Sequence, residues 1–205
     1  MRYNHQVKGT EGYSEVTDKF IEATKEIDFM KLHQAFIEFI PNNSVRVLDV
    51  GAGIGRDASV LAKMGHDVVA VEPAASFRAA ARRLYDVPNI QWIDDSLPML
   101  SVLGNQTEQF DFVLASSVWH HLDDAEQQHA MLRISNLLRS DAIFALSLRH
   151  GPAGAGTHVF SMDGQQTIEY AEAWGLRSLL HLPNQPSLMQ GKEAVTWTRL
   201  VFVKA

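Results

Sequence analysis

Short apolar runs alternate with amphipathic stretches between residues 45 and 150. An apolar run of this kind is typical of a parallel strand covered on both faces, and an amphipathic stretch between two such runs is typical of a crossover helix. The pattern therefore predicts a doubly wound α/β sheet. The predicted strands are Val45–Val50, Val68–Val71, Ile90–Ile93, Phe110–Ala115 and Ala142–Leu148, and the predicted helices are Asp57–Met64, Ser76–Tyr85 and Ala125–Leu138.

A helical pattern precedes this region. Over Val16–Ile40, apolar residues such as Phe20 and Phe36 recur at helical spacing, and Pro41 with two asparagines stops the pattern. We therefore expect residues 1–44 to form a helical preface to the sheet.

The end of the chain combines a glycine-rich loop, a helix and two strands. Residues Gly151–Gly156 favour a mobile loop, and Asp163 followed by Gln166 resembles a capping box that begins a helix. The last apolar segments, Leu176–Leu182 and Ala194–Val203, are joined by a connection without a helix, so we expect them to pair antiparallel. The predicted sheet then has seven strands, is mostly parallel and ends in an antiparallel hairpin.

Length and composition fit one globular unit. The chain has 205 residues, of which 46% are hydrophobic and 20% are charged, which is ordinary usage for a folded domain. We expect a single domain over residues 1–205. It divides into the preface at 1–44, a core at 45–150 and a last part at 151–205.

Charge and cysteine content exclude some classes of function. Eighteen basic residues against 24 acidic ones give a net charge of -6, which repels a polyanion and makes nucleic acid an unlikely partner. The absence of cysteine excludes disulfides, thiolate metal sites and cysteine nucleophiles. Residues 1–10 lack a signal-peptide pattern and no run is long enough to cross a membrane, so we expect a cytoplasmic protein without a membrane partner.

A glycine turn follows the first predicted strand. Gly51, Gly53 and Gly55 lie between that strand and a helix, and glycine permits both positive φ and close approach of a ligand to main-chain amides. Glu72 ends the second strand, where an acid can accept both hydroxyls of a ribose. A dinucleotide site prefers a wider glycine spacing, and bulky Arg56 follows the last glycine here. The spacing favours a nucleotide-like ligand without a pyrophosphate.

Five segments in order resemble the class I S-adenosylmethionine-dependent methyltransferases. They read VLDVGAGIGRDA from residue 47, AVEP from 70, IDDSLP from 93, FDFVLASSVWHHL from 110 and AIFALSL from 142. The resemblance implies that S-adenosylmethionine is the cofactor, that Glu72 binds its ribose, and that Asp95 with Ser96, or alternatively Asp94, binds its adenine. The cofactor-binding residues that it implies are Asp49, Gly51, Ala52, Gly53, Gly55, Arg56, Glu72, Pro73, Asp94, Asp95, Ser96, Ala115 and Ser116.

Candidate acceptor-side residues follow the fourth and fifth strands. His120, His121 and His150 are candidate general bases, since imidazole titrates near neutral pH, although His121 also fits a structural role. Trp119 and Arg149 are candidate substrate residues, Arg149 for an anionic acceptor. In relatives the N-terminal segment often folds over the cofactor as a lid, which makes Tyr13, and also Tyr3, candidates.

No metal site is expected from the sequence. His120 and His121 are followed closely by Asp123 and Asp124, but adjacent residues point in different directions and do not converge on one ion.

The expected reaction is methyl transfer to a small-molecule acceptor. After Ala115 the chain continues Ser116-Ser117-Val118, without the Asn/Asp-Pro-Pro-aromatic run by which relatives hold a planar nitrogen. The small-molecule branch of the family that remains resembles the quinone-biosynthesis methyltransferases. The match to any named member is poor after Arg149. Two alternatives remain: a non-catalytic sensor or partner subunit that binds S-adenosylmethionine or S-adenosylhomocysteine, and a nicotinamide dehydrogenase, which Arg56 and the glycine spacing oppose.

Overall fold

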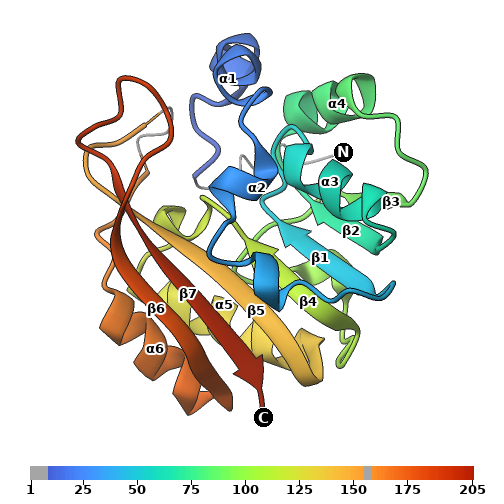
Figure 1. The fold of residues 1–205 in the computed structure, drawn as a ribbon, viewed down its shortest axis with the longest axis vertical. Helices are drawn as coiled ribbons and strands as arrows, with labels where there is room; N and C mark the ends of the chain where they lie inside the picture. The colour runs from blue at the N-terminus through green and yellow to red at the C-terminus, as the bar shows by residue number, and fades with distance from the viewer. Residues whose placement is uncertain (1–8, 155–157) are drawn as a thin grey trace, which may run out of the picture.

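The computed structural model describes residues 9–154 and 158–205, which form one seven-stranded sheet (Figure 1). The strand order is β3-β2-β1-β4-β5-β7-β6. The first five strands run parallel and β7 pairs antiparallel with both β5 and β6. The strands are β1 (Arg46–Val50), β2 (Asp67–Val71), β3 (Ile90–Ile93), β4 (Phe110–Ala115), β5 (Leu138–His150), β6 (Leu176–Pro186) and β7 (Thr196–Lys204).

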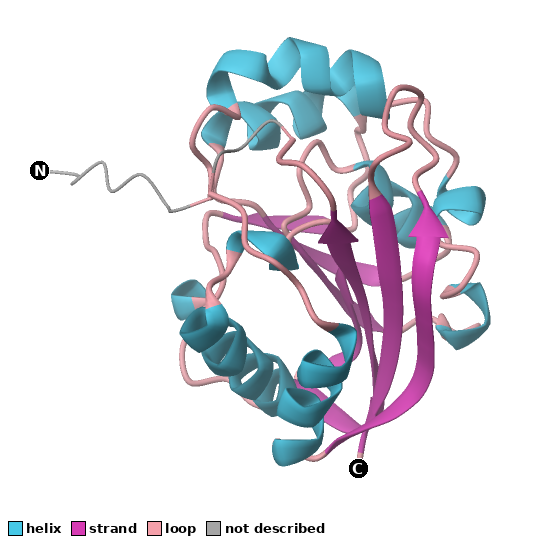
Figure 2. Cartoon of the chain, turned by 90° about the vertical axis from the view of Figure 1, so that its left-hand side faces the viewer, coloured by secondary structure: helices cyan, strands magenta, loops and turns pink. Residues whose placement is uncertain are grey.

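Helices cover both faces of the sheet and the edge where the parallel strands end (Figures 1 and 2). On one face α5 and α6 pack on β4, β5 and β7, and on the other face α2 and α3 pack on β1 and β2. Both α1 and α4 lie beyond the end of the sheet toward which β1 points. The helices are α1 (Thr17–Thr24), α2 (Phe29–Leu32), α3 (Arg56–Lys63), α4 (Ala75–Leu84), α5 (Asp124–Leu137) and α6 (Gly164–Ala173), with 3-10 turns η1 (Ser14–Val16), η2 (Ile37–Phe39), η3 (Ser101–Leu103) and η4 (Trp119–His121).

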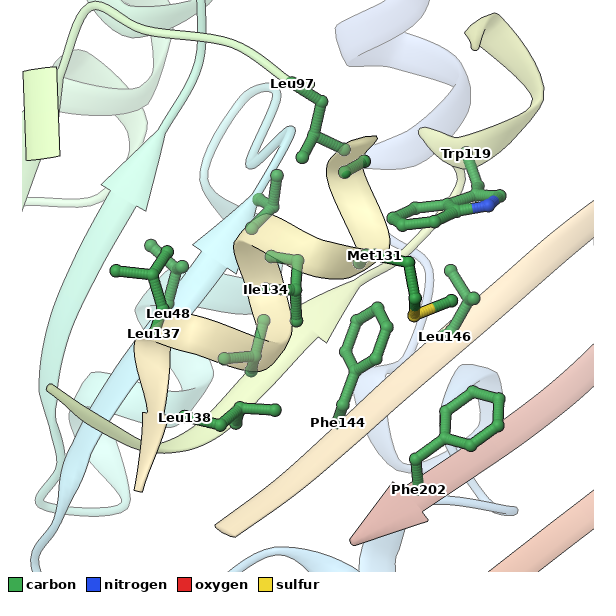
Figure 3. Packing of buried hydrophobic residues seen from close by; sticks show 14 of the residues in the cluster. Leu48, Leu97, Trp119, Met131, Ile134, Leu137, Leu138, Phe144, Leu146 and Phe202 are labelled. Carbon is green, nitrogen blue, oxygen red and sulfur yellow. The ribbon is translucent and has the colours of Figure 1, made fainter. Parts of the chain in front are cut away.

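The larger apolar core lies under α5. Figure 3 shows Met131 and Ile134 of α5 near Phe144 of β5, with Trp119 beside Met131. These side chains are completely buried. Burying a side chain of this size contributes roughly 1.5–3 kcal/mol each, so this layer holds the ends of β4 and β5 firmly in place beneath the site.

The predicted fold class is confirmed, and the strand predictions are right to within two residues except at β5 and β6. The β5 strand begins at Leu138, immediately after α5, rather than at Ala142, and β6 extends to Pro186 rather than Leu182. The antiparallel hairpin of β6 and β7 forms as expected from its short connection. None of the described helices is both long enough and apolar enough to cross a lipid bilayer.

One local prediction gains detail and another needs correction. The helical preface consists of short pieces, because Asp28 is extended and its side chain accepts a hydrogen bond from the Lys31 amide, which starts a new helix there. The Asp163 side chain caps α6 through the Gln165 and Gln166 amides. The reciprocal capping box occurs instead at α5, where Asp123 and Glu126 bond to each other's backbone.

Candidate functional site

The glycine turn after β1 lies at the centre of the sheet's carboxyl edge. The amides of Gly51 and Ala52 both donate to the Val71 carbonyl at 2.9 Å, so the turn is tied to the end of β2. Gly51 has φ 69°, and a Cβ there would lie 2.8 Å from Val118. Gly53 has φ 56°, but its nearest neighbour, Phe77, would lie 3.9 Å from an added Cβ. Gly51 is therefore needed for packing, whereas the space beside Gly53 is open to a ligand.

The Glu72 carboxylate is held by the backbone of this turn. One oxygen accepts from the Gly53 amide at 3.0 Å and the other from the Ala74 amide at 2.8 Å. The residue is 7% exposed, and burial raises the pKa of its carboxyl to about 7 against the opposing effect of these hydrogen bonds. Each oxygen retains a second acceptor position, so the carboxylate can receive two ligand hydroxyls.

A cluster of buried charges backs the glycine turn. Asp49 is buried, and its Oδ2 has no hydrogen-bond partner among residues 9–154 and 158–205. Burial, with Asp57 nearby, raises the pKa of Asp49 well above its usual range. Arg56 forms an ion pair with Asp57 at 2.8 Å and donates to the Thr24 carbonyl at 3.3 Å, which ties α3 to the preface. Asp49 is 2% exposed and is not among the residues that line the cavity described below.

The two acids after β3 have different surroundings. Asp95 accepts from the amides of Ser96, Ser101 and Val102, and so holds the following loop. Asp94 is exposed and forms an ion pair with Arg78 at 2.6 Å. Asp95 and Ser96 line the central cavity, whereas Asp94 is not among its lining residues.

One cavity of about 460 Å³ connects these groups with the ends of β4, β5 and β7. This volume is typical of a small-molecule site. The cavity is bounded on its outer side by the preface, since Tyr13 and Phe20 pack on Phe77 of α4. Of the sequence-predicted residues, it is lined by Tyr13, Gly51, Ala52, Gly53, Arg56, Glu72, Pro73, Asp95, Ser96, Ser116, His120, His121 and Arg149.

A tyrosine and a histidine face each other at the far end of the cavity. The Tyr13 hydroxyl lies 3.1 Å from Nε2 of His121, and Nδ1 of His121 lies 2.8 Å from the His158 carbonyl. A carbonyl only accepts, so Nδ1 carries the hydrogen and, in the neutral ring, Nε2 accepts from the Tyr13 hydroxyl. Burial is the largest influence on His121 and lowers its pKa, whereas burial raises the pKa of Tyr13. Both groups are therefore neutral at pH 7.

His120 and Arg149 complete this end of the cavity. The His120 ring lies 4.2 Å from the His121 ring, centroid to centroid, and burial, helped by His121 and Arg149, lowers the pKa of His120 to about 2. Arg149 pairs with Trp197 across β5 and β7, and both residues line the cavity.

Besides Asp49 and Asp94, four predicted site residues do not line the cavity. Trp119 is completely buried and packs on Phe144, because the η4 turn directs its ring beneath the site (Figure 3). His150 bonds to Thr198 at 2.8 Å on the opposite face of β5 from Arg149, as strand alternation requires. The third and fourth, Ala115 and Gly55, are enclosed: Ala115 is buried in β4, and the position of Gly55 is packed by Trp92. Tyr3 and residues 155–157 of the glycine-rich loop lie outside the described residues.

Sequence reasoning missed one wall of the cavity. This wall is formed by the start of β7 and the connection before it, whose composition carries no ligand-binding motif. Trp197 could have been found from the hairpin register, which sets it beside Arg149. Behind it, the buried Arg199 guanidinium lies 5.1 Å from the Trp197 ring centroid. The other contributors are Ser187, Leu188, Met189, Lys192 and Val195.

Within the part of the chain that the structure describes, no group of three or more His, Asp or Glu side chains is placed to hold an ion.

Comparison with known families gives a match to a family described as Methyltransferase domain, over residues 47–141. This range begins in β1 and reaches the start of β5, so it includes the glycine turn and Glu72.

A curated relative is the ubiquinone biosynthesis O-methyltransferase of Azorhizobium caulinodans, which is 30% identical over 118 residues. That alignment covers 53% of this chain and 46% of the relative. The chain thus spans about half the length of the curated relatives it matches.

Solved structures match over nearly the whole chain. A TehB-like S-adenosylmethionine-dependent methyltransferase from Corynebacterium glutamicum superposes with a TM-score of 0.68 at 24% identity, covering 94% of this chain and 98% of that one. The Burkholderia thailandensis 1,6-didemethyltoxoflavin-N1-methyltransferase, solved with 1,6-didemethyltoxoflavin and S-adenosylhomocysteine bound, gives a TM-score of 0.67 at 17% identity. It covers 100% of this chain and 93% of that one. At these identities the likeness shows a shared fold.

Proposed function

We propose that this chain, which belongs to the class I S-adenosylmethionine-dependent methyltransferases, transfers the methyl group of that cofactor to a small-molecule acceptor. The family and fold expected from the sequence are confirmed by the domain match and the shared architecture. The acceptor class rests on one observation: a single cavity of about 460 Å³ joins the glycine turn and Glu72 to a separate polar end at His121 and Arg149.

The residues present fit the cofactor. Glu72 offers two acceptor positions suited to ribose hydroxyls. Open space beside Gly53 admits a ligand against the main chain. Bound S-adenosylmethionine supplies an electrophilic methyl group on a sulfonium. Asp95 and Ser96 line the cavity on the side expected for the adenine.

The polar end of the cavity provides a route for the acceptor's proton. Tyr13 is placed to accept a proton from the acceptor's hydroxyl or amine while passing its own proton to Nε2 of His121. The His158 carbonyl fixes the ring through Nδ1–H and stabilises the imidazolium that results. His121 is thus the proposed general base, acting through Tyr13. His120 remains neutral and forms part of the wall.

A small acceptor is supported by the size of the cavity and by the relatives. Its volume suits one cofactor-sized ligand with one small partner, rather than a macromolecule. The relatives include an O-methyltransferase of ubiquinone biosynthesis and an N-methyltransferase of a toxoflavin precursor, which support a planar ring compound as the acceptor.

The first experiment is isothermal titration with S-adenosylmethionine and S-adenosylhomocysteine. Wild type should bind both with micromolar affinity, and Glu72→Ala should bind neither well. Turnover is then measured as S-adenosylhomocysteine formed from S-adenosylmethionine over a panel of phenols, catechols and nitrogen heterocycles. Failure to bind either ligand would refute the proposal. Tight binding without product from any acceptor class would instead favour a sensor or partner subunit.

A further inference from the structure

Arg149 is a buried cation to which the chain supplies no carboxylate. It is 9% exposed, and within residues 9–154 and 158–205 its guanidinium makes one hydrogen bond, to the Gly151 carbonyl at 3.4 Å, and no ion pair. The remaining residues, 1–8 and 155–157, contain no Asp or Glu. Residues 1–8 and 155–157 therefore supply no Asp or Glu that could neutralise the charge of Arg149.

The side chains next to Arg149 do not neutralise its positive charge. Tyr13, His120 and His121 are all close enough to be influenced by its charge, and each is neutral at pH 7. Burial is the main cause of its lowered pKa, and only Tyr13 opposes that effect. A guanidinium desolvated in this way costs free energy unless an anion accepts its hydrogen bonds.

A second buried arginine has neighbours that compensate its charge. Arg199 lies two residues after Trp197 on β7 and is 6% exposed. It stacks on Trp197 and on Phe36, and it has Asp57 near enough to raise its pKa against the effect of burial. Among the residues that the structure describes, Arg149 has no acid that raises its pKa and no stacked ring, and it lines the cavity.

Arg149 lies at the end of the cavity that the proposed function gives to the acceptor. In the strand order, β4 and β5 lie on the opposite side of β1 from β2 and β3, which carry Glu72 and Asp95. Arg149 ends β5 on that opposite side, next to the Tyr13–His121 pair. Trp197 lies beside it on β7 and gives the same end of the cavity an aromatic wall.

We propose that the methyl acceptor is a planar molecule that carries an oxyanion, either a carboxylate or a phosphate, and that Arg149 binds this oxyanion. The guanidinium can donate two parallel hydrogen bonds to either group. Fixing one end of the acceptor there leaves its nucleophilic group free to reach Tyr13. Lys192, also on the cavity wall, adds a second positive charge to the approach. This inference rests on the proposed methyltransferase function.

The test uses the full-length protein saturated with S-adenosylhomocysteine and three matched probes: benzoate, phenyl phosphate and the neutral benzamide. Calorimetry should show binding of at least one anionic probe and little binding of benzamide. Arg149→Met should lower the affinity for the anionic probe by about tenfold or more, and Arg149→Lys should lower it less. Arg177→Met, which removes an exposed charge from β6, is the control and should bind the probe as wild type does.

The outcomes separate this inference from the proposed function. Unchanged affinity for S-adenosylhomocysteine in Arg149→Met shows that the variant is folded and that the cofactor end is intact. Equal binding of benzoate, phenyl phosphate and benzamide, or loss of cofactor affinity rather than probe affinity in Arg149→Met, would overturn the oxyanion assignment. Failure of wild type to bind S-adenosylhomocysteine would instead overturn the methyltransferase proposal. Preference between benzoate and phenyl phosphate identifies the oxyanion.

Discussion

The two ends of the cavity are built in different ways. At the cofactor end, the groups come from neighbouring stretches of chain and are held by main-chain hydrogen bonds, as where Glu72 accepts from the Gly53 and Ala74 amides. At the acceptor end, Tyr13, His121 and Arg149 come from segments far apart in the sequence and meet only through tertiary packing.

This difference separates a part that depends on local chain geometry from a part that depends on tertiary packing. A turn held by its own backbone depends on glycine and on one acid. Side chains brought together from separate segments can each be replaced without disturbing the sheet. The acceptor end is therefore where specificity can vary, and variants at the two ends should fail in different ways.

The largest effect is expected at the acceptor end. Tyr13→Phe keeps the ring contacts with Phe20 and Phe77 but removes the hydroxyl, and His121→Gln removes the base. Each should lower turnover by about 100-fold with an acceptor that must lose a proton, since general base catalysis supplies at least that much. Affinity for S-adenosylhomocysteine should stay within about twofold, because neither residue belongs to the cofactor end.

The control for this prediction is His150→Gln, since His150 bonds to Thr198 outside the cavity lining. Its turnover should match that of wild type. A loss in His150→Gln as large as that in His121→Gln, measured under saturating cofactor, would contradict the assignment of the base.

The second effect concerns cofactor affinity. Glu72→Ala removes the acceptor for two ribose hydroxyls and leaves the Gly53 and Ala74 amides without their partner. We expect a loss of about 2 kcal/mol, roughly 30-fold in the Kd of S-adenosylhomocysteine by calorimetry. Asp94→Ala is the matched control, because Asp94 does not line the cavity. An equal loss in Asp94→Ala would place the adenine beside Asp94 instead of Asp95.

A third effect is the pH dependence of cofactor binding. Burial raises the pKa of Glu72 to about 7 in the free protein, so its carboxyl is largely neutral below that pH and ionised above it. The ionised form accepts hydroxyls more strongly, so affinity for S-adenosylhomocysteine should rise by up to about tenfold from about pH 6 to about pH 8. Titrations in buffers of different ionisation enthalpy should detect a released proton. Glu72→Gln should abolish the rise in affinity. A Glu72→Gln variant whose affinity still rises with pH would refute this explanation.

The smallest effect distinguishes the two glycines. Gly53→Ala has space for its Cβ and costs mainly the strain of a positive φ, about 1–2 kcal/mol of unfolding free energy. Gly51→Ala adds a close contact with Val118 to the same strain, so its melting temperature should fall further. Thermal unfolding of both variants without ligand measures this difference, and equal melting temperatures would contradict it.

The sequence by itself determined the sheet, its order of elements and the places of the glycine turn and Glu72 after β1 and β2; that these residues bind the cofactor stays a prediction. Alternating apolar and amphipathic segments specify parallel strands with crossover helices, and the short final connection specifies the hairpin. The glycine turn and Glu72 could be assigned because both follow directly from local chain geometry. The errors lie at strand ends: β5 begins at Leu138 directly after α5, and β6 extends to Pro186.

Only the tertiary structure decided the acceptor end. His120, His121 and Arg149 could be proposed from their place after strands, but nothing local separates Arg149, which lines the cavity, from His150, which faces the other side of the sheet. Trp119 looked equally suited and lies in the core. The pairing of Tyr13 with His121 spans 108 residues. Such contacts depend on how the preface packs across the sheet, which no local pattern of residues records.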